Sequence, residues 1–205
     1  RAPNRQQGKI VIYELSGDIL LSGAKAIVQG VAPNDDFHSG LALQLRERMP
    51  AMYKDFRHFC QTRHPKSGGL WTWMSADGRF IVNLFTREAA YGHGSKPGLA
   101  SLSHVNHALH ALHALVEKEK FPSIALPRLA CGLTGLNWDD PGICVYHLSK
   151  RRQSRRTSQI KIRKQYLGAS ENSEFAQMQG AGEILQRRIW VICKQEIFPA
   201  TQQLG

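Results

Sequence analysis

Short apolar runs alternate with segments of helical spacing over the first two thirds of the chain. The runs are rich in β-branched and aromatic residues and end before turn-forming residues, a pattern that predicts strands. They cover residues 9–15, 26–31, 70–74, 79–86 and 123–126. Asp77 and Gly78 lie between the third and fourth runs and predict a hairpin turn there.

Three segments have the spacing of helices. The first covers residues 41–49 and is preceded by Ser39, whose hydroxyl suits a helix N-cap. The second begins at Pro50, because proline is tolerated in the first turn of a helix. The third runs from Ser101 or Ser103 to about residue 120. The order of these strands and helices predicts an α/β protein with three α/β/α layers around a mixed central sheet.

Four histidines lie on the third predicted helix, at His104, His107, His110 and His113. Pairs of histidines three residues apart can hold a metal weakly, but no cysteine or carboxylate joins them at ligand spacing. The apolar residues of the helix cluster on the opposite side. The pattern therefore favours a solvent-exposed face, and the sequence predicts no metal site.

The composition suits one soluble domain of ordinary size with an appendage. Hydrophobic residues make up 42% of the 205 residues, which is enough to build a core. No apolar run reaches the length of a membrane span, and residues 1–8 lack the apolar segment of a signal peptide, so we expect a cytoplasmic protein without membrane association. The four cysteines form no Cys-x-x-Cys pair, which favours reduced thiols over a zinc site or a disulfide framework.

Basic residues are concentrated in the last third of the chain. The formal net charge is +11, which suggests an acidic partner such as nucleic acid or a phosphorylated ligand. Residues 141–205 hold 11 of the 27 Lys and Arg residues but only 4 of the 16 Asp and Glu residues. Non-specific nucleic-acid binding by this segment would weaken steeply as salt is added.

Two loops are suited to holding an anion. Gly132 and Gly135 follow the last predicted strand, and glycines let backbone N–H groups turn toward a ligand. Residues 32–40, hereafter the first loop, lead into the N-terminus of a helix, where unpaired N–H groups and the helix dipole favour phosphate. Ligands of α/β sheets sit outside the carboxyl ends of strands, where both loops are expected. Taken alone, a glycine-bearing loop after a strand is more often only a tight turn.

Four short motifs are found together in one known family, in this order and at this spacing. They are Gly-Asp-Ile-Leu at residues 17–20, Ala-Ile-Val-Gln-Gly-Val at 26–31, Ser-Gly-Leu-Ala-Leu at 39–43, and the stretch at 125–138 that includes Cys-Gly-Leu-Thr-Gly-Leu-Asn-Trp. The chain resembles the macro domain family over residues 9–140, most closely its branch of Appr-1-p processing proteins, which includes terminal ADP-ribose hydrolases. The resemblance implies a macro domain at residues 1–140 that binds ADP-ribose, whether free, protein-linked or as the 1″-phosphate.

The resemblance also implies which residues bind ADP-ribose. Asp18 would accept a hydrogen bond from the adenine amino group, since a carboxylate offers only acceptors; its alternative role is to cap the turn that follows. The first loop would wrap the distal ribose, and residues 129–136 would hold the diphosphate. The implied ligand-binding residues are Asp18, Ile19, Gly30, Ser39, Gly40, Leu41, Thr86, Ala130, Cys131, Gly132, Leu133, Thr134 and Gly135.

The chain departs from the hydrolases of this family at their catalytic positions. Members that remove ADP-ribose from glutamate have a lysine after the threonine that ends the hairpin strand and an aspartate in the second loop, where this chain has Arg87 and Thr134. Arginine stays protonated in proteins, so it cannot attack the anomeric carbon as a lysine amine would. Members that act on ADP-ribose 1″-phosphate use a histidine where this chain has Gln29 or Gly30.

The first loop supplies other candidates for catalysis. Asp35, Asp36 and His38 combine carboxylates with an imidazole, which together can accept a proton. His93 and Lys96 are further candidates in the glycine-rich residues 87–99, hereafter the flap, which are numerous enough to close over a ligand. The alternative in both cases is a polar surface loop.

The resemblance stops near residue 140. Pro141 and Gly142 interrupt the place where the family continues with a helix, and residues 150–164 form a basic polar run. One interpretation makes residues 141–205 a genuine, partly disordered extension, in which residues 189–193 replace the family's closing strand. The other is a reading frame that shifted near Asp140. The loss of regular periodicity favours the second interpretation, which would leave a strand of the sheet unpaired.

The sequence therefore leaves three functions to distinguish. The first is ADP-ribose binding with hydrolysis of an ADP-ribosyl or phosphate ester. The second is a non-catalytic reader of ADP-ribosylated proteins. The third is nucleic-acid binding through the basic segment, which would survive Asp18→Ala and weaken with salt. Whether the chain is an enzyme stays open on the sequence, and no cofactor is expected.

Overall fold

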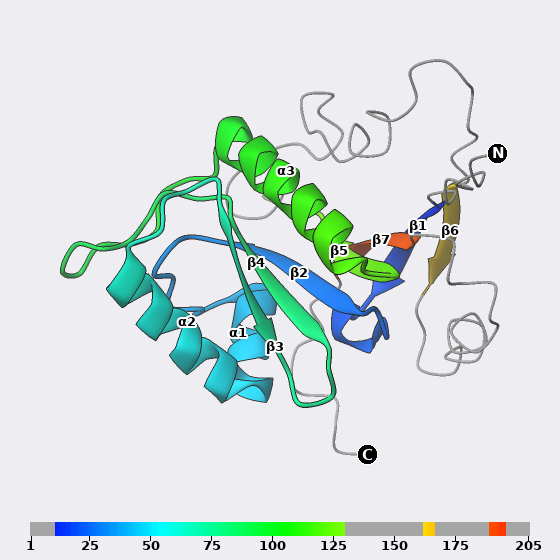
Figure 1. The fold of residues 1–205 in the computed structure, drawn as a ribbon, viewed down its shortest axis with the longest axis horizontal. Coiled ribbons are helices and arrows are strands. Elements are labelled where there is room, and N and C mark those ends of the chain that lie inside the picture. The colour runs from blue at the N-terminus through cyan, green and yellow to red at the C-terminus, as the bar shows by residue number, and fades with distance from the viewer. Residues whose placement is uncertain (1–10, 130–161, 167–188, 196–205) are drawn as a thin grey trace, which may run out of the picture.

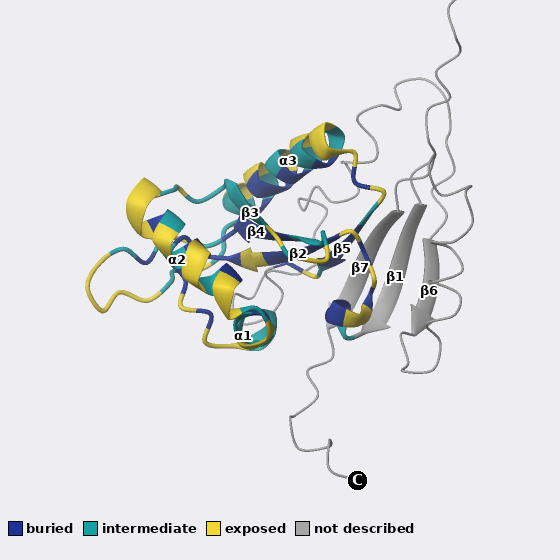
Figure 2. Ribbon diagram, turned by 60° about the horizontal axis from the view of Figure 1, so that its bottom comes forward, coloured by how far each residue is buried: buried dark blue, intermediate teal, exposed yellow. Residues whose placement is uncertain are grey.

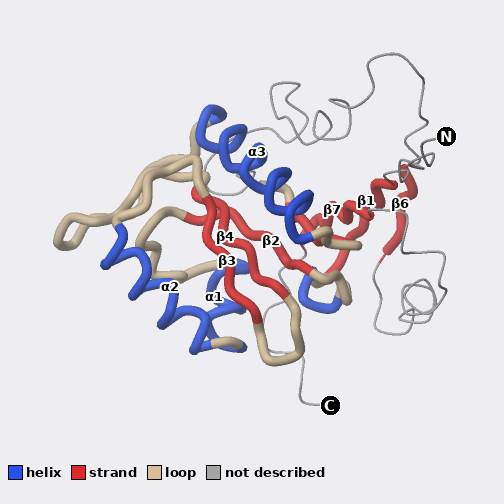
Figure 3. Tube along the Cα trace, in the orientation of Figure 1, coloured by secondary structure: helices blue, strands red, loops and turns tan. Residues whose placement is uncertain are grey.

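A seven-stranded sheet forms the centre of the computed structural model, which describes residues 11–129, 162–166 and 189–195 (Figure 1). The strands are β1 (Val11–Gly17), β2 (Ala26–Val31), β3 (Leu70–Met74), β4 (Phe80–Phe85), β5 (Ser123–Pro127), β6 (Ile162–Tyr166) and β7 (Ile189–Gln195). Their order across the sheet is β3-β4-β2-β5-β7-β1-β6. β3 and β4 pair antiparallel, whereas the remaining neighbours pair in parallel. Figure 3 shows the strands in red between the blue helices. The predicted mixed sheet is thus confirmed.

Helices cover both faces of this sheet. They are the short 3₁₀ helix η1 (Ile19–Leu21) and the α-helices α1 (Gly40–Arg48), α2 (Pro50–Arg63) and α3 (Leu102–Glu119). α3 lies on one face, and α1 and α2 lie on the other (Figures 1 and 2). The three α/β/α layers predicted from the sequence are therefore present. Within the described residues, no helix combines the length and apolar character needed to cross a bilayer.

Alternation along the strands divides the core in two. Successive side chains of a strand point to opposite faces, so Ala26 and Val28 of β2 pack with α3 while Ile27 packs with α1 and α2. The cluster on the α1–α2 side contains Phe37 of the first loop, which is fully buried. Packing of Phe37 into the core therefore anchors the first loop to the body of the domain.

Local sequence signals account for the ends of the helices. Pro50 occupies the first turn of α2, as predicted. Ser101 is the N-cap of α3, and its hydroxyl oxygen accepts a hydrogen bond from His104 N at 3.1 Å. Ser39 occupies the N-cap position of α1, but its side chain makes no capping bond. Earlier in the chain, β1 continues through residues 16 and 17, where the sequence pattern predicts a turn.

The last third of the chain contributes two strands to the sheet. β7 pairs in parallel with both β5 and β1, and β6 pairs with the other side of β1. β7 thus holds the position that the interpretation of a genuine extension gives to residues 189–193. The unpaired strand expected from a shifted reading frame is wrong for β1 and β5. The predicted strand at 143–148 lies outside the described residues, and the division of the chain near residue 140 stays a prediction.

The histidines of α3 do not share one environment. His107 and His110 are exposed, as predicted, whereas His104 and His113 are half-buried. His107 Nδ1 lies 2.8 Å from the carbonyl oxygen of Ser103, one turn earlier. The exposed pair therefore belongs to the polar side of a helix whose opposite side packs on the sheet.

Candidate functional site

The carboxyl ends of three parallel strands meet at one place. Gly30 near the end of β2 lies so close to Thr86, which follows β4, that a Cβ atom at Gly30 would be 2.9 Å from Thr86 Oγ1 and 3.3 Å from Leu129 Cδ2. Leu129 comes just after β5. Thr86 is buried, and its N–H donates to the carbonyl of Val31 at 3.0 Å. This end of the sheet is where ligands of open α/β sheets bind.

Asp18 follows β1 and begins η1. Its Oδ1 accepts a hydrogen bond from Leu20 N at 2.9 Å, so the capping role that the sequence left open is present. Oδ2 lies 3.5 Å from a guanidinium nitrogen of Arg48, the last residue of α1. The carboxylate keeps 21% of its surface exposed. One oxygen is thus committed to the turn, and the other faces a half-exposed cation and solvent.

Asp35 holds the first loop in shape. The loop turns through left-handed conformations at Asn34 and Phe37, with φ of 61° and 52°. Asp35 Oδ2 accepts from Ala32 N at 3.1 Å and Oδ1 accepts from Phe37 N at 2.9 Å, which closes the loop upon itself. The Arg57 guanidinium of α2 donates to the carbonyl oxygens of Asn34 and Asp35 from outside the loop.

Asp36 and His38 form an exposed pair on the same loop. His38 Nδ1 lies 2.6 Å from Asp36 Oδ1, and both side chains are more than half exposed. Although partial burial raises the pKa of Asp36, the hydrogen bond to His38 and the charge of the imidazole bring it below its ordinary value. When the imidazole is neutral, an ionised Asp36 favours the tautomer with a proton on Nδ1, which leaves Nε2 as a proton acceptor.

Asp35, Asp36 and His38 have ligand atoms within 4.8 Å of one another, and among the described residues they are the one such group of His, Cys, Asp and Glu side chains. The oxygens of Asp35 already accept from two backbone N–H groups. The carboxylate of Asp35 is thus shared with the first loop, while Asp36 and His38 are exposed.

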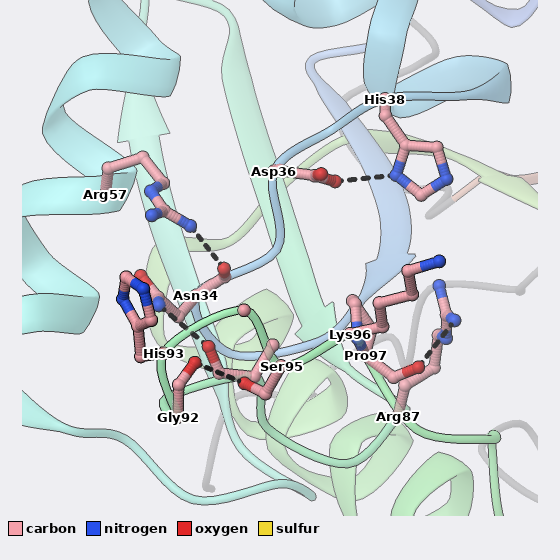
Figure 4. Close-up of a pocket in the computed structure, with 12 residues that line it drawn as sticks. Asn34, Asp36, His38, Arg57, Arg87, Gly92, His93, Ser95, Lys96 and Pro97 are labelled. Carbon is pink, nitrogen blue, oxygen red and sulfur yellow. Dashed lines mark hydrogen bonds and ion pairs between the residues drawn. The ribbon is translucent and has the colours of Figure 1, made fainter.

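A cavity of about 620 Å³ lies between the first loop, α2 and the flap (Figure 4). It has the size of a small-molecule site. The residues that line it are Asn34, Asp36, His38, Arg57, Arg87, Ala90, Gly92, His93, Gly94, Ser95, Lys96 and Pro97. The lining thus combines the Asp36–His38 pair with three cationic side chains, those of Arg57, Arg87 and Lys96.

The flap is tied to the body of the domain at its base. The Ser67 hydroxyl donates to the carbonyl of Arg87 at 2.7 Å, and Tyr91 OH donates to the carbonyl of Pro65 at 2.8 Å. Desolvation of the phenol, together with the electrostatic effect of the neighbouring Cys60, raises the pKa of Tyr91 to about 12. Figure 3 shows the flap as a long loop extending outward beside α2.

The structure brings some of the expected ligand-binding residues together and buries the side chain of another. Gly30 and Thr86 meet at the strand ends, and Gly40 begins α1 with φ of 61°. The Ile19 side chain is fully buried in the core, which leaves a ligand only its backbone. Ser39 is exposed and Leu41 packs partly against the core. Ala130, Cys131, Gly132, Leu133, Thr134 and Gly135 lie outside the described residues.

Two arginines of the site could not be found from the sequence. Arg57 lies on the polar side of α2, where a cation is ordinary, and nothing in its spacing points to the first loop. The sequence points to Arg87 only through the family resemblance, which implies a lysine at this position in the hydrolases. Their roles depend on carbonyl groups of distant segments, for which the sequence holds no signal.

Sequence comparison finds relatives of part of the chain. No protein-family model matches the chain. Curated relatives from Mycobacterium bovis and Mycobacterium tuberculosis, each described as a DNA ADP-ribosyl glycohydrolase, are 27% identical over 128 residues, or 61% of this chain. The chain matches only 35% of the length of these relatives.

Solved structures of macrodomains are similar to this chain. The macrodomain of Mycobacterium tuberculosis DarG aligns with a TM-score of 0.60 at 22% identity, over 78% of this chain and 99% of its own. Thermosipho africanus DarTG in complex with ADP-ribose aligns with a TM-score of 0.55 at 20% identity, over 77% of this chain and 42% of its own. The chain therefore has the macrodomain fold, and the resemblance drawn from its four motifs is confirmed at the level of the fold.

Proposed function

We propose that the chain binds ADP-ribose at the carboxyl ends of β2, β4 and β5, beside the first loop. The observation that carries this proposal is the macrodomain fold, shared with Thermosipho africanus DarTG, whose structure contains ADP-ribose. The first loop leads into the N-terminus of α1, whose free N–H groups and dipole suit a diphosphate. Asp18 is the expected partner of the adenine amino group, with Oδ2 facing outward from its capping bond.

Calorimetric titration of ADP-ribose into the whole chain and into Asp18→Asn tests this proposal. Asparagine can still accept the hydrogen bond from Leu20 N, so the cap and the stability are kept. It also places a donor amide where the carboxylate had only acceptors. We expect binding by the wild type and a loss of roughly tenfold or more in Asp18→Asn, the loss expected when a buried donor faces another donor.

Arg48→Ala is the matched control, because it removes the cation beside Asp18 and leaves the carboxylate in place. We expect nearly unchanged binding in Arg48→Ala. If folded wild-type protein does not bind ADP-ribose at either of two salt concentrations, the proposal is wrong. If binding survives in Asp18→Asn but falls steeply with salt, contact through the basic segment explains it better.

We further propose that the Asp36–His38 pair gives the site hydrolytic activity. His38 Nε2 accepts a proton from a water molecule, whose oxygen attacks the anomeric carbon of the distal ribose. The bond from that carbon to the acceptor breaks, and the acceptor leaves with the electron pair and takes up a proton from solvent, while His38 returns its proton to solvent. Asp36 orients the imidazole and stabilises its protonated form, since the two side chains are 2.6 Å apart. Asp35 has no part in this proton transfer, because its oxygens accept hydrogen bonds within the first loop.

ADP-ribosylated DNA is the first substrate to test. The curated relatives are described as DNA ADP-ribosyl glycohydrolases, and the cavity presents the cations Arg57, Arg87 and Lys96. Turnover would be assayed on ADP-ribosylated DNA, on ADP-ribosylated protein and on ADP-ribose 1″-phosphate. We expect release of ADP-ribose from DNA, and its loss in Asp36→Asn.

A non-catalytic reader is the second candidate, favoured by Arg87 and Thr134 at positions where related hydrolases have lysine and aspartate. The reader would bind all forms of ADP-ribose and turn over none. Binding by the wild type without release from any of the three substrates would decide for it.

A further inference from the structure

Arg87 connects the flap with the first loop. It stands directly after Thr86, at the base of the flap, and its side chain is 24% exposed. Its Nε donates to the carbonyl of Gly98 at 2.9 Å, and an Nη donates to the carbonyl of Pro97 at 3.3 Å, both on the returning arm of the flap. The other Nη lies 3.8 Å from Asp35 Oδ2. One guanidinium thus holds the two arms of the flap together and reaches the first loop.

Its partner in the first loop is a buried carboxylate. The Asp35 side chain is only 7% exposed, and it also accepts from Ala32 N and Phe37 N. A buried carboxylate is costly to leave without a charged partner. The same group that shapes the first loop therefore depends on a cation supplied by the flap.

Backbone contacts run beside this ion pair. Ala90 N donates to the carbonyl of Pro33 at 3.1 Å, and Asn34 Nδ2 donates back to the carbonyl of Ala90 at 2.9 Å. Figure 4 shows Asn34 and Arg87 on different sides of the cavity. The flap and the first loop are therefore joined both by the contacts of Ala90 and by the ion pair of Arg87, and the cavity lies between these two sets of contacts.

We propose that Arg87 is a positioning residue that couples the flap to the first loop, so that ordering one segment orders the other. The arginine fork is suited to this role, because its donors reach two carbonyls and a carboxylate at once and it stays charged. The effect of bound ADP-ribose on the flap through Arg87 rests on the proposed function. The coupling of the flap to the first loop in the absence of ligand does not.

Amide hydrogen exchange on the whole chain tests the coupling without ligand. Arg87→Ala should raise exchange about tenfold at the flap amides of Ala90 and Gly98 and also at Ala32 and Phe37 of the first loop, the factor expected for one lost charge-assisted interaction. Ser67→Ala is the matched control. It removes the bond to the backbone carbonyl of Arg87 and leaves the guanidinium contacts intact, so the first loop should exchange as in the wild type.

Arg87→Lys separates charge from geometry. A lysine keeps a cation near Asp35 but has no fork for the carbonyls of Pro97 and Gly98, so the flap amides should exchange faster while the first loop changes less. This variant also serves if Arg87→Ala does not fold. Unchanged exchange of Ala32 and Phe37 in folded Arg87→Ala would overturn the coupling.

The second arm adds saturating ADP-ribose. In the wild type and in Ser67→Ala, bound ligand should slow exchange in the flap. In Arg87→Ala, binding should weaken about tenfold and the saturated protein should show no slowing in the flap. Ligand-induced slowing of the flap that persists in saturated Arg87→Ala contradicts the inference. Absence of ADP-ribose binding in the wild type would refute the proposed function alone, since the first arm still decides the role of Arg87.

Discussion

Gly30 and Thr86 approach each other too closely for any side chain at position 30. A Cβ atom there would lie 2.9 Å from Thr86 Oγ1 and 3.3 Å from Leu129 Cδ2. We predict that Gly30→Ala lowers the free energy of unfolding by about 1–3 kcal/mol, the usual cost of overpacking. Denaturant unfolding would measure it.

The control for this prediction is the double variant Gly30→Ala with Thr86→Ala, which removes the hydroxyl that the new methyl would meet. The second change should restore part of the lost stability, as expected for residues in contact. Equal stability of Gly30→Ala and the wild type would show that β2 and β4 adjust freely at this point.

Asp35 and Asp36 are neighbours in sequence with opposite environments. Asp35→Asn should lower the free energy of unfolding by about 2 kcal/mol, because its buried oxygens accept from Ala32 N and Phe37 N and face Arg87. Asp36 is 59% exposed, so Asp36→Asn should change stability by less than about 0.5 kcal/mol. Thermal unfolding of both variants would measure the difference.

Turnover assays on the same two variants separate folding from chemistry. Under the proposed hydrolysis, the stable Asp36→Asn variant loses activity because the imidazole of His38 loses its orienting carboxylate. Stability losses of the same size in both variants would contradict the roles assigned to the two carboxylates.

The sequence predicts elements well where local signals agree. α2 begins at Pro50, and of the apolar residues on its predicted inner face Met52, Phe56 and Cys60 are buried while Phe59 is half-buried. The Asp77-Gly78 turn is found between β3 and β4, with Gly78 at φ of 78°. In these places one short segment contains both the spacing of the element and its boundary.

The sequence predicts less where distant segments decide. β7 lies between β5 and β1. This position depends on pairing with both strands, and no regular periodicity in the sequence predicts it. Ser39 has the residue type of a capping side chain, yet it makes no capping bond. Asp35 was a candidate base by residue type, and only the bonds from Ala32, Phe37 and Arg87 show its oxygens to be engaged.

Cys60 should resist modification in the folded protein. It is fully buried on α2, and burial raises the pKa of its thiol although a backbone bond from Asn34 and the charge of Arg57 lower it. We predict that alkylation at neutral pH is much slower in the native protein than in denaturant, as followed by mass spectrometry of the peptide containing Cys60. Equal rates would mean that the first loop above Cys60 opens readily.

The tether of Tyr91 to Pro65 should weaken in alkali. The ordinary phenol pKa of 10.0 is raised to about 12 by desolvation and by Cys60, so the fold favours the neutral phenol that donates to the carbonyl of Pro65 at 2.8 Å. Tyr91→Phe should lower the free energy of unfolding by about 1 kcal/mol near neutral pH, the net value of one such hydrogen bond.

The sign of the pH dependence follows from the raised pKa. Above the ordinary value of 10.0 the unfolded chain releases the proton while the folded chain keeps it until about 12, so wild-type stability falls in this interval. Tyr91→Phe lacks this proton, and the advantage of the wild type should therefore be complete below the ordinary value and shrink above it. Denaturant unfolding of both proteins over this pH range, with ultraviolet absorbance to follow tyrosinate, measures the effect. A constant difference across the range would place Tyr91 OH in solvent, and the flap would then be tied to the domain by Ser67 and Arg87 without it.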